Sequence, residues 1–327
     1  MRIDSANLRI GFRKQKILTG VSENILVIKL GALGDIVQAT GPFAAIRAHH
    51  KDSRITLLTG PAYAAFLKRS CWFDDIWIDE RPGWKNWRAW FRLRHRLKRG
   101  RFARVYDLQT SDRSSSYFHL MLPGSRPEWS GIARFASHPH ANKRRDDMHT
   151  VDRQAEQLHM AGIETVPAPS MDWVDADVSR FGLAAPYVLL VPGGSAHRPE
   201  KRWSVGSYTE LARRLVARGV TPVLIGAGAD AHATGIVDSF CDGARDLTAE
   251  TSFAEIVALA RGAVGAVGND TGPMHIIATA GCPTVTLYSF ASNPALCAQK
   301  GPDVTILRRD LLTELSVDEV EAALKLH

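Results

Sequence analysis

The chain has few cysteines and no long hydrophobic run. Of its 327 residues only Cys71, Cys241, Cys282 and Cys297 are cysteine, and none belongs to a CxxC pair or a Cys/His ligand pattern. This spacing argues against zinc and disulfide frameworks, so we expect reduced thiols. No apolar run approaches the roughly 20 residues of a membrane-spanning helix. Residues 1–23, interpreted as an N-terminal extension, lack a signal-peptide core, and we therefore expect a cytoplasmic protein.

Acidic residues are absent from one stretch, Arg81–Arg104, which contains ten Lys and Arg residues. Trp84, Trp87, Trp90 and Phe91 are interleaved there at helical spacing. One interpretation is a solvated helix with its aromatic side chains in the core. The other, which we favour, is peripheral contact with an anionic inner leaflet or glycolipid. The formal net charge of +7 favours acidic partners, but no nucleic-acid motif is present and we expect no nucleic acid partner.

Short β-branched runs alternate with longer helical patterns, which is typical of parallel strands joined by helices. We expect strands at residues 24–29, 54–58, 75–78, 104–107, 187–191, 222–225, 265–268 and 284–287. The irregular, proline-containing segment 166–186 is interpreted as a linker. The chain is thus expected to be an α/β protein with two Rossmann-like domains, residues 24–165 and 187–312, and a C-terminal helix within 313–327. In such folds ligands bind at the carboxyl ends of the strands.

The first candidate site follows the first expected strand, in the run Lys29–Asp35. Gly31 and Gly34 permit close approach of a ligand to the backbone. Asp35 lies at the expected start of a helix and faces the cleft, although an aspartate there is also a favoured N-cap.

The second candidate site is the glycine-rich loop Val191–Ser195, followed by Lys201. A strand, a loop with a hydroxyl group and then a lysine suit a phosphate group, although the spacing is not that of a P-loop. A solvated surface loop remains the alternative.

The third candidate site, Gly268–His275, is the most informative. Pro273 suits the first turn of a helix, with Thr271 or Gly272 as its cap, and the exposed amides of that turn form an anion site. The helix dipole disfavours a charged His275, which could then donate one neutral N–H group to a ligand.

Two other motifs are weaker. Gly226–Ala231 matches G-x-G-x-x-A, with Asp246 further on, but we expect no strand ending at Asp246. The pair Asp175 and Asp177 resembles a metal-binding DxD, but capping and solvation explain it better. We expect no metal and no cofactor.

Taken together, these residues resemble glycosyltransferase family 9, the heptosyltransferases of lipopolysaccharide core assembly. The matching pieces occur in the family's order over roughly residues 24–288, and D-T-G-x-x-H at Asp270–His275 is the most specific. The others are residues 25–35, Asp107–Gln109, Lys201–Trp203 with Tyr208 and Glu210–Ala212, Asp246–Thr248, and Gly281–Val285.

The resemblance implies a GT-B fold and an inverting, metal-independent transfer of a sugar from a nucleotide-diphosphate donor, ADP-heptose above all, to an anionic glycolipid of the lipopolysaccharide inner core. By that resemblance Asp35 is the general base, and Lys201 stabilises the leaving diphosphate. The implied donor-binding residues are Ser195, Lys201, Asp230, Leu247, Asp270, Thr271, Gly272 and His275. The implied acceptor-binding residues are Gly34, Gln109 and Arg113.

Three alternatives remain from the sequence. The same fold could use another nucleotide sugar. The Gly226–Ala231 turn could serve a nucleotide-binding oxidoreductase. The basic stretch could belong to a non-catalytic module at a membrane.

Overall fold

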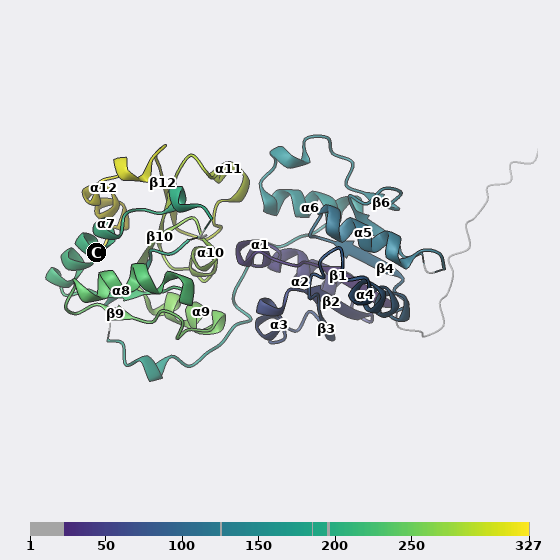
Figure 1. The fold of residues 1–327 in the computed structure, drawn as a ribbon, viewed down its shortest axis with the longest axis horizontal. Coiled ribbons are helices and arrows are strands. Elements are labelled where there is room, and N and C mark those ends of the chain that lie inside the picture. Colours follow the sequence, from purple (N-terminus) through teal and green to yellow (C-terminus); the bar gives the residue numbers. More distant parts are fainter. Residues whose placement is uncertain (1–22, 125, 185, 195–196, 327) are drawn as a thin grey trace, which may run out of the picture.

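The computed structural model of the chain describes residues 23–124, 126–184, 186–194 and 197–326. Residues 1–22 of the expected extension, and the candidate donor residue Ser195, lie outside this described part. Within it, the secondary structure forms two parallel sheets of six strands each. Figure 1 shows them in two halves of the molecule: the N-terminal half (β1 to α6) and the C-terminal half (β7 to α12).

The first sheet has the strand order β3-β2-β1-β4-β5-β6. Its strands are β1 (Asn24–Ile28), β2 (Arg54–Thr59), β3 (Asp75–Ile78), β4 (Arg104–Asp107), β5 (Glu128–Gly131) and β6 (His138–Pro139). The second sheet has the equivalent order β12-β11-β10-β7-β8-β9. Its strands are β7 (Tyr187–Val191), β8 (Thr221–Leu224), β9 (Arg245–Asp246), β10 (Gly265–Asn269), β11 (Thr284–Tyr288) and β12 (Val304–Arg308).

Helices connect the strands in both halves. In the N-terminal half they are α1 (Leu33–Gln38), α2 (Thr40–His49), α3 (Pro61–Leu67), α4 (Trp87–Arg99), α5 (Asp112–Met121) and α6 (Thr150–Met160). In the C-terminal half they are α7 (Val205–Ala217), α8 (Ala231–Ser239), α9 (Phe253–Gly262), α10 (Gly272–Thr279), α11 (Pro294–Cys297) and α12 (Val317–Leu324). The last of these lies within the expected C-terminal helix and packs against α7, β10 and β11 of the second sheet.

The central strands are apolar on both faces because helices cover both faces of each sheet. In β1, Ile25 and Val27 belong to one buried cluster, whereas Leu26 and Ile28 belong to another. In β7, likewise, Leu189 belongs to one buried cluster and Leu190 to another. These continuous apolar runs made the central strands predictable, and β3, β4 and β7 have the predicted limits.

Four strands were not predicted. β6 and β9 have only two residues each, and the sequence of β5, Glu-Trp-Ser-Gly, has little strand character. β12 lies at the edge of its sheet and is only half-buried. The expectation that no strand ends at Asp246 was wrong, because β9 pairs in parallel with β8 and places Asp246 opposite Leu224.

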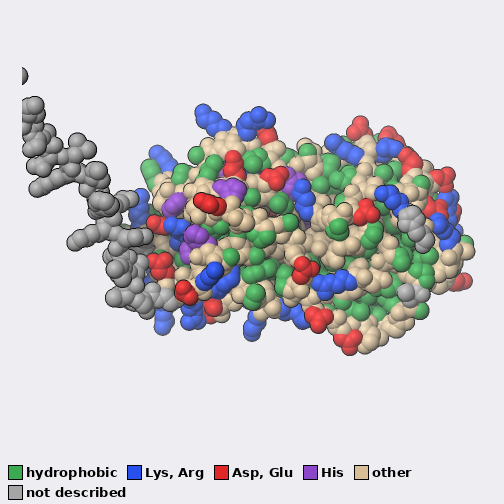
Figure 2. Space-filling view, turned by 180° about the vertical axis from the view of Figure 1, so that it is seen from behind, with side chains coloured by type: hydrophobic (Ala, Val, Ile, Leu, Met, Phe, Trp, Pro, Cys, Tyr) green, Lys and Arg blue, Asp and Glu red, His purple; other side chains and the backbone are tan. Residues whose placement is uncertain are grey.

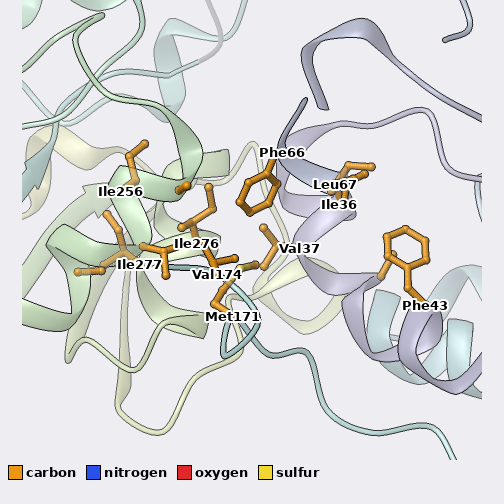
Figure 3. Packing of buried hydrophobic residues seen from close by; sticks show 14 of the residues in the cluster. Ile36, Val37, Phe43, Phe66, Leu67, Met171, Val174, Ile256, Ile276 and Ile277 are labelled. Atoms are coloured by element: carbon orange, nitrogen blue, oxygen red, sulfur yellow. The ribbon is translucent and has the colours of Figure 1, made fainter. Parts of the chain in front are cut away.

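One hydrophobic cluster continues from one half into the other. It contains Ile36 and Val37 of α1 together with Ile276 and Ile277 of α10. Figure 3 shows these side chains with Phe66 of α3 between the two halves. The halves therefore share an apolar interface, which fixes how their sheets face one another.

The expected linker packs against both halves. Met171 and Val174 are buried in the shared cluster, and the Thr40 hydroxyl of α2 accepts a hydrogen bond from the Ser170 N–H group. The Arg261 guanidinium of α9 donates to the carbonyls of Met171 and Val174. Hydrogen bonds and apolar contacts thus hold the segment in place.

The shared cluster predicts where truncation costs most. Ile276 is fully buried, so Ile276→Ala should lower the free energy of unfolding by about 2–5 kcal/mol, measured by urea denaturation. Ile78 is 43% exposed, and Ile78→Ala is the matched control, with an expected loss below about 1 kcal/mol. Equal losses in the two variants would contradict a cluster that bridges the halves.

Candidate active site

Two adjoining cavities lie between the halves, at the carboxyl ends of the central strands. The larger has a volume of about 660 Å³ and the smaller about 480 Å³. Both are lined by Lys201, Asp270, Thr271 and Gly272. These four residues therefore mark the junction at which ligands in the two cavities would meet.

The larger cavity belongs mainly to the C-terminal half. The loops after β7 and β8 contribute Gly193, Gly194 and Gly226 to its wall, together with Asp230. The glycines let the backbone come close to a ligand. The G-x-G-x-x-A motif therefore lines this cavity, but it follows the second strand of its sheet, whereas a dinucleotide fingerprint occupies the first βα turn.

Asp35 stands in the smaller cavity, in the first turn of α1. The N-cap position is taken by Ala32, so the interpretation of Asp35 as the cap residue itself was wrong. One carboxylate oxygen, Oδ2, accepts a hydrogen bond of 3.0 Å from the Ala32 N–H group. The other, Oδ1, lies 3.9 Å from the Lys29 ammonium group. The carboxylate is thus oriented by the backbone while its side chain stays 39% exposed.

Lys29 is a buried cation behind this carboxylate. Its ammonium group donates a hydrogen bond of 3.1 Å to the Leu108 carbonyl. Burial lowers the pKa of Lys29, an effect that the negative charge of Asp35 opposes. The negative charge of Asp35 thus favours the charged form of Lys29.

Lys201 and Asp270 form the ion pair at the junction. The Lys201 ammonium group lies 2.9 Å from Asp270 Oδ2, and both side chains are largely buried. Ser292 donates to the same oxygen and Gln299 to Oδ1. Burial alone would raise the pKa of Asp270, but the bonds from Ser292 and Lys201 and the Lys201 charge outweigh it and lower the pKa. Asp270 is therefore ionised and holds Lys201 at the junction.

Thr271 and His275 carry polar atoms without a hydrogen-bond partner among the described residues. Thr271 is the N-cap of α10, yet its hydroxyl makes no cap hydrogen bond and its oxygen is buried. His275 is only 6% exposed, and its Nδ1 atom is likewise unpaired. A buried polar group without a partner is costly, and both residues line the smaller cavity, where a ligand could supply a partner.

The imidazole of His275 is neutral. Burial lowers its pKa to about 4, although the carboxylates of Asp270 and Asp35 act in the opposite direction. The sequence suggested the helix dipole as the cause, whereas the structure gives desolvation as the largest one.

Glycine is needed where α1 meets α10. A Cβ atom on Gly34 would lie 2.7 Å from the His275 ring, and one on Gly272 would lie 2.7 Å from Leu33. Each helix start therefore packs against the other without room for a side chain. Gly34, a candidate acceptor residue, has this packing role in addition to lining the smaller cavity.

The remaining donor candidates differ in accessibility. Asp230 lines the larger cavity, but its two oxygens accept hydrogen bonds from the Gly194 and Ala227 N–H groups. It thereby joins the two glycine-rich loops. The Leu247 side chain is fully buried in the shared cluster and does not line the cavity, so its contact with a donor could come only through the backbone.

The acceptor candidates lie beside the carboxyl ends of β1 and β4. Gln109 accepts a hydrogen bond of 2.8 Å from the Leu30 N–H group. The Arg113 guanidinium donates to the Pro82 carbonyl and lies over the Trp90 ring. Arg113 is therefore held in place, and neither residue lines the smaller cavity in this arrangement.

Several residues that line the cavities were not predicted. Leu33, Ala62 and Tyr63 reach the larger cavity from the N-terminal half, and the Tyr63 ring stacks with Phe253 of α9. Gln38, Arg198 and Cys297 line the smaller cavity. Apart from Leu33, which lies in the run Lys29–Asp35, none belongs to a predicted motif, and the docking of the two halves brings them to the site.

Among the described residues, no three His, Cys, Asp or Glu side chains gather in a way that could hold a metal ion. The described cysteines are all unpaired: Cys241 and Cys282 are buried, Cys297 is half-buried and Cys71 is exposed. The same part of the chain contains no helix that is both long and apolar enough to cross a bilayer.

Two Rossmann-like halves, each with a parallel sheet, that enclose a cleft define the class: this is a protein of the GT-B fold. A family model described as "Glycosyltransferase family 9 (heptosyltransferase)" matches residues 90–325. The chain therefore belongs to glycosyltransferase family 9, as its motifs predicted, and is a glycosyltransferase.

Characterised relatives agree with this assignment. The chain is 28% identical to lipopolysaccharide heptosyltransferase 2 of Salmonella typhimurium over 311 residues, which cover 82% of this chain and 83% of that protein. It is 27% identical to lipopolysaccharide heptosyltransferase 2 of Escherichia coli over 234 residues, covering 62% of this chain and 64% of that protein. The match thus spans somewhat less than two thirds of the E. coli enzyme.

Solved structures share the fold. A glycosyl transferase family 9 protein from Veillonella parvula has a TM-score of 0.80 at 19% identity, covering 92% of this chain and 95% of that one. E. coli ADP-heptose lps heptosyltransferase II has a TM-score of 0.76 at 20% identity, covering 92% and 97%. The predicted GT-B fold is confirmed.

The lowered pKa of His275 predicts a stability change with pH. The native state binds fewer protons than the unfolded state between pH about 4 and 6.5, so stability falls as the pH is lowered through this range. His275→Gln should reduce that loss by up to about 3 kcal/mol, because one pKa unit corresponds to 1.36 kcal/mol. Urea denaturation at several pH values measures it.

The exposed His159→Gln variant is the control and should keep the wild-type dependence on pH. Burial also lowers the pKa of His50 to about 4, so some dependence should remain in His275→Gln. An unaltered dependence in His275→Gln would contradict a buried, neutral His275.

Proposed function

We propose that this protein transfers heptose from ADP-heptose to an anionic glycolipid of the lipopolysaccharide inner core, with inversion at the sugar carbon and without a metal. The observation that carries the proposal is the pair of adjoining cavities, one lined by Asp35 and the other by the glycine-rich loops of the C-terminal half. The names of the characterised relatives support heptose as the sugar. A related structure, E. coli heptosyltransferase WaaC with ADP, supports the nucleotide.

Asp35 acts as the general base in this proposal. Its Oδ2 atom is occupied by the Ala32 N–H group, which leaves Oδ1 to accept the proton of the acceptor hydroxyl. The hydroxyl oxygen attacks the sugar carbon as the bond from that carbon to the diphosphate oxygen breaks. Because an alcohol becomes acidic only as the new bond forms, a positioned carboxylate helps most in the transition state.

The leaving diphosphate gains negative charge, and the junction provides the groups that stabilise it. Lys201 supplies a cation, Thr271 an unpaired hydroxyl, and the start of α10 its free amides. The ammonium group of Lys201 has three donors, so it can bind a phosphate oxygen without releasing Asp270. Ser195 and Asp230 would complete the donor site.

The donor can be tested by thermal shift with ADP, UDP, GDP, CMP and NADH, each with Mg²⁺ and with EDTA. A ligand that binds only the folded state raises the melting temperature by mass action. Stabilisation by ADP alone, equal in both conditions, is expected. Stabilisation by UDP or GDP instead would mean that the donor is a sugar linked to that nucleotide and not ADP-heptose. A response to NADH alone would favour the oxidoreductase.

Removal of the base should abolish turnover and leave donor binding intact. Asp35→Asn should lower kcat about 100- to 10,000-fold, the usual contribution of a general base, in an assay with ADP-heptose and a lipid A–Kdo acceptor. Its ADP affinity should match that of the wild type. Asp175→Asn, in the exposed part of the linker, is the control and should keep full activity. Wild-type turnover in Asp35→Asn would rule out the assigned role.

We also propose peripheral contact with an anionic inner leaflet through Arg81–Arg104, and therefore a cytoplasmic location. The aromatic residues of this segment differ in burial. Trp90 packs against the core, whereas Trp84, Trp87 and Phe91 are 82%, 61% and 63% exposed. The interpretation of all four as core residues was therefore wrong for three of them.

The surroundings of these rings suit a membrane surface. α4 carries Arg and Lys residues along its whole length and no acidic residue. In the view from behind, Lys and Arg side chains, with some Asp and Glu side chains among them, lie on the surface at the end of the molecule that contains α4 (Figures 1 and 2). The first turn of α4 lies beside Arg113, since Trp90 contacts its guanidinium. Exposed aromatic rings among cations are the features of a helix that lies in the headgroup layer.

The membrane proposal predicts the effect of removing the exposed rings. The triple variant Trp84→Ser, Trp87→Ser and Phe91→Ser should bind anionic phosphatidylglycerol vesicles at least tenfold more weakly in a sedimentation assay. Phe240→Ser, which removes an exposed ring from the C-terminal half, should bind like the wild type. Equal binding of the wild type to neutral phosphatidylcholine vesicles would argue against recognition of charge.

A further inference from the structure

The segment Ser292–Gln299, here called the strap, contains α11 and is anchored at both ends on one carboxylate. Ser292 Oγ donates a hydrogen bond of 2.6 Å to Asp270 Oδ2, and Gln299 Nε2 donates one of 3.3 Å to Asp270 Oδ1. Because Asp270 also pairs with Lys201, the strap is tied to the group that we assign to the leaving diphosphate.

The middle of the strap is bound to the other half of the molecule. Backbone carbonyls of the strap accept hydrogen bonds from three side chains of the N-terminal half: Gln38, Thr150 and His149, whose Nε2 atom donates to the Ala298 carbonyl at 3.1 Å. Gln38 Nε2 of α1 donates to the carbonyls of Ala298, at 3.1 Å, and Cys297, at 3.4 Å. The Thr150 hydroxyl of α6 donates to the Leu296 carbonyl at 3.2 Å.

Gln38 connects this contact to the base. It is buried, lines the smaller cavity and lies three residues after Asp35, on the same short helix. The contact between Gln38 and the strap therefore holds α1 at a set distance from Asp270 and Lys201. The hydrogen bonds to two carbonyls of the strap add a directional constraint on α1 to its apolar packing against α10.

We propose that Gln38 is a positioning residue for the transfer reaction: through the strap it sets the separation between the Asp35 carboxylate and the donor held at Lys201. This inference rests on the proposed function. It assigns Gln38 no contact with the reacting atoms. Its loss should therefore slow the chemical step and leave donor binding nearly unchanged.

The first test compares kcat and KM in Gln38→Met, which keeps the size of the side chain and removes both donors. The expected result is a fall in kcat of about 10- to 100-fold, since a misplacement of about 1 Å can cost 100-fold. The KM for ADP-heptose should stay within threefold of wild type. An unchanged kcat would overturn the proposal.

Gln154→Met is the matched control. Gln154 is a buried glutamine of α6 that, in the described part of the chain, makes no hydrogen bond to the C-terminal half. Its substitution should leave kcat within twofold of wild type. An equal fall in kcat in both variants would show a general effect of losing a buried amide and would overturn the proposal.

A second pair of variants covers the case in which Gln38→Met does not fold. Thr150→Val removes the hydrogen bond to the Leu296 carbonyl and leaves that of His149 to the Ala298 carbonyl, and Ser292→Ala removes one anchor on Asp270. If the strap acts as one unit, the double variant should lose less activity than the product of the two single losses. Independent, multiplicative losses would contradict a shared role.

A substrate-free measurement separates this proposal from the proposed function. Cys297 lies on the strap and is half-buried, whereas Cys71 is the exposed thiol. In a Cys71→Ser background, Gln38→Met should increase the rate of Cys297 alkylation by N-ethylmaleimide at least fivefold. An unchanged rate would overturn the role of Gln38 in holding the strap. A wild-type chain that does not turn over would refute the proposed function alone.

Discussion

The contact between the starts of α1 and α10 is the constraint on which the site depends. Each start has a glycine where the other presents a side chain: Gly34 faces His275, and Gly272 faces Leu33. The isoleucines and valines behind them close the apolar interface (Figure 3). This packing brings Asp35 from one half and Lys201 from the other into the walls of the same smaller cavity. Larger residues at these glycines would push α1 and α10 apart and so increase the distance between Asp35 and Lys201.

The charges at the site are arranged as two lysine–carboxylate pairs, one from each half. In the N-terminal pair, Lys29 is buried and Asp35 is accessible, so the carboxylate faces the ligand. In the C-terminal pair, Asp270 has bonds from Ser292 and Gln299 as well as Lys201. There the Asp270 carboxylate already has hydrogen bonds from protein side chains, and the Lys201 ammonium group keeps N–H donors for a phosphate oxygen. The same pair of residue types thus supports a base on one side and an anion site on the other.

Most of the fold could be predicted because the central strands are apolar on both faces and are followed by glycine-rich turns. β6 and β9, with two residues each, and the half-exposed edge strand β12 lack that signal. Asp35, Lys201 and Thr271 could be found because each stands shortly after a strand. Tyr63, Gln38 and Arg198 could not, since their place at the site depends on the docking of distant segments. For the same reason, helical spacing did not show that Trp87 faces solvent and Trp90 the core.

Each half of the molecule is continuous in sequence: β1 to α6 come first, β7 to α12 follow, and the segment between them, residues 161–186, joins the two. In evolutionary terms the halves are modules. A single recombination event within that segment would exchange the half that bears Asp35 and keep the half that bears the glycine-rich loops. Such a chimera would keep its interface only if the new half brought a small residue to face His275 and an apolar one to face Gly272. A large side chain facing His275, or a polar one facing Gly272, would cost the chimera this interface whatever ligand-contacting residues the new half carried.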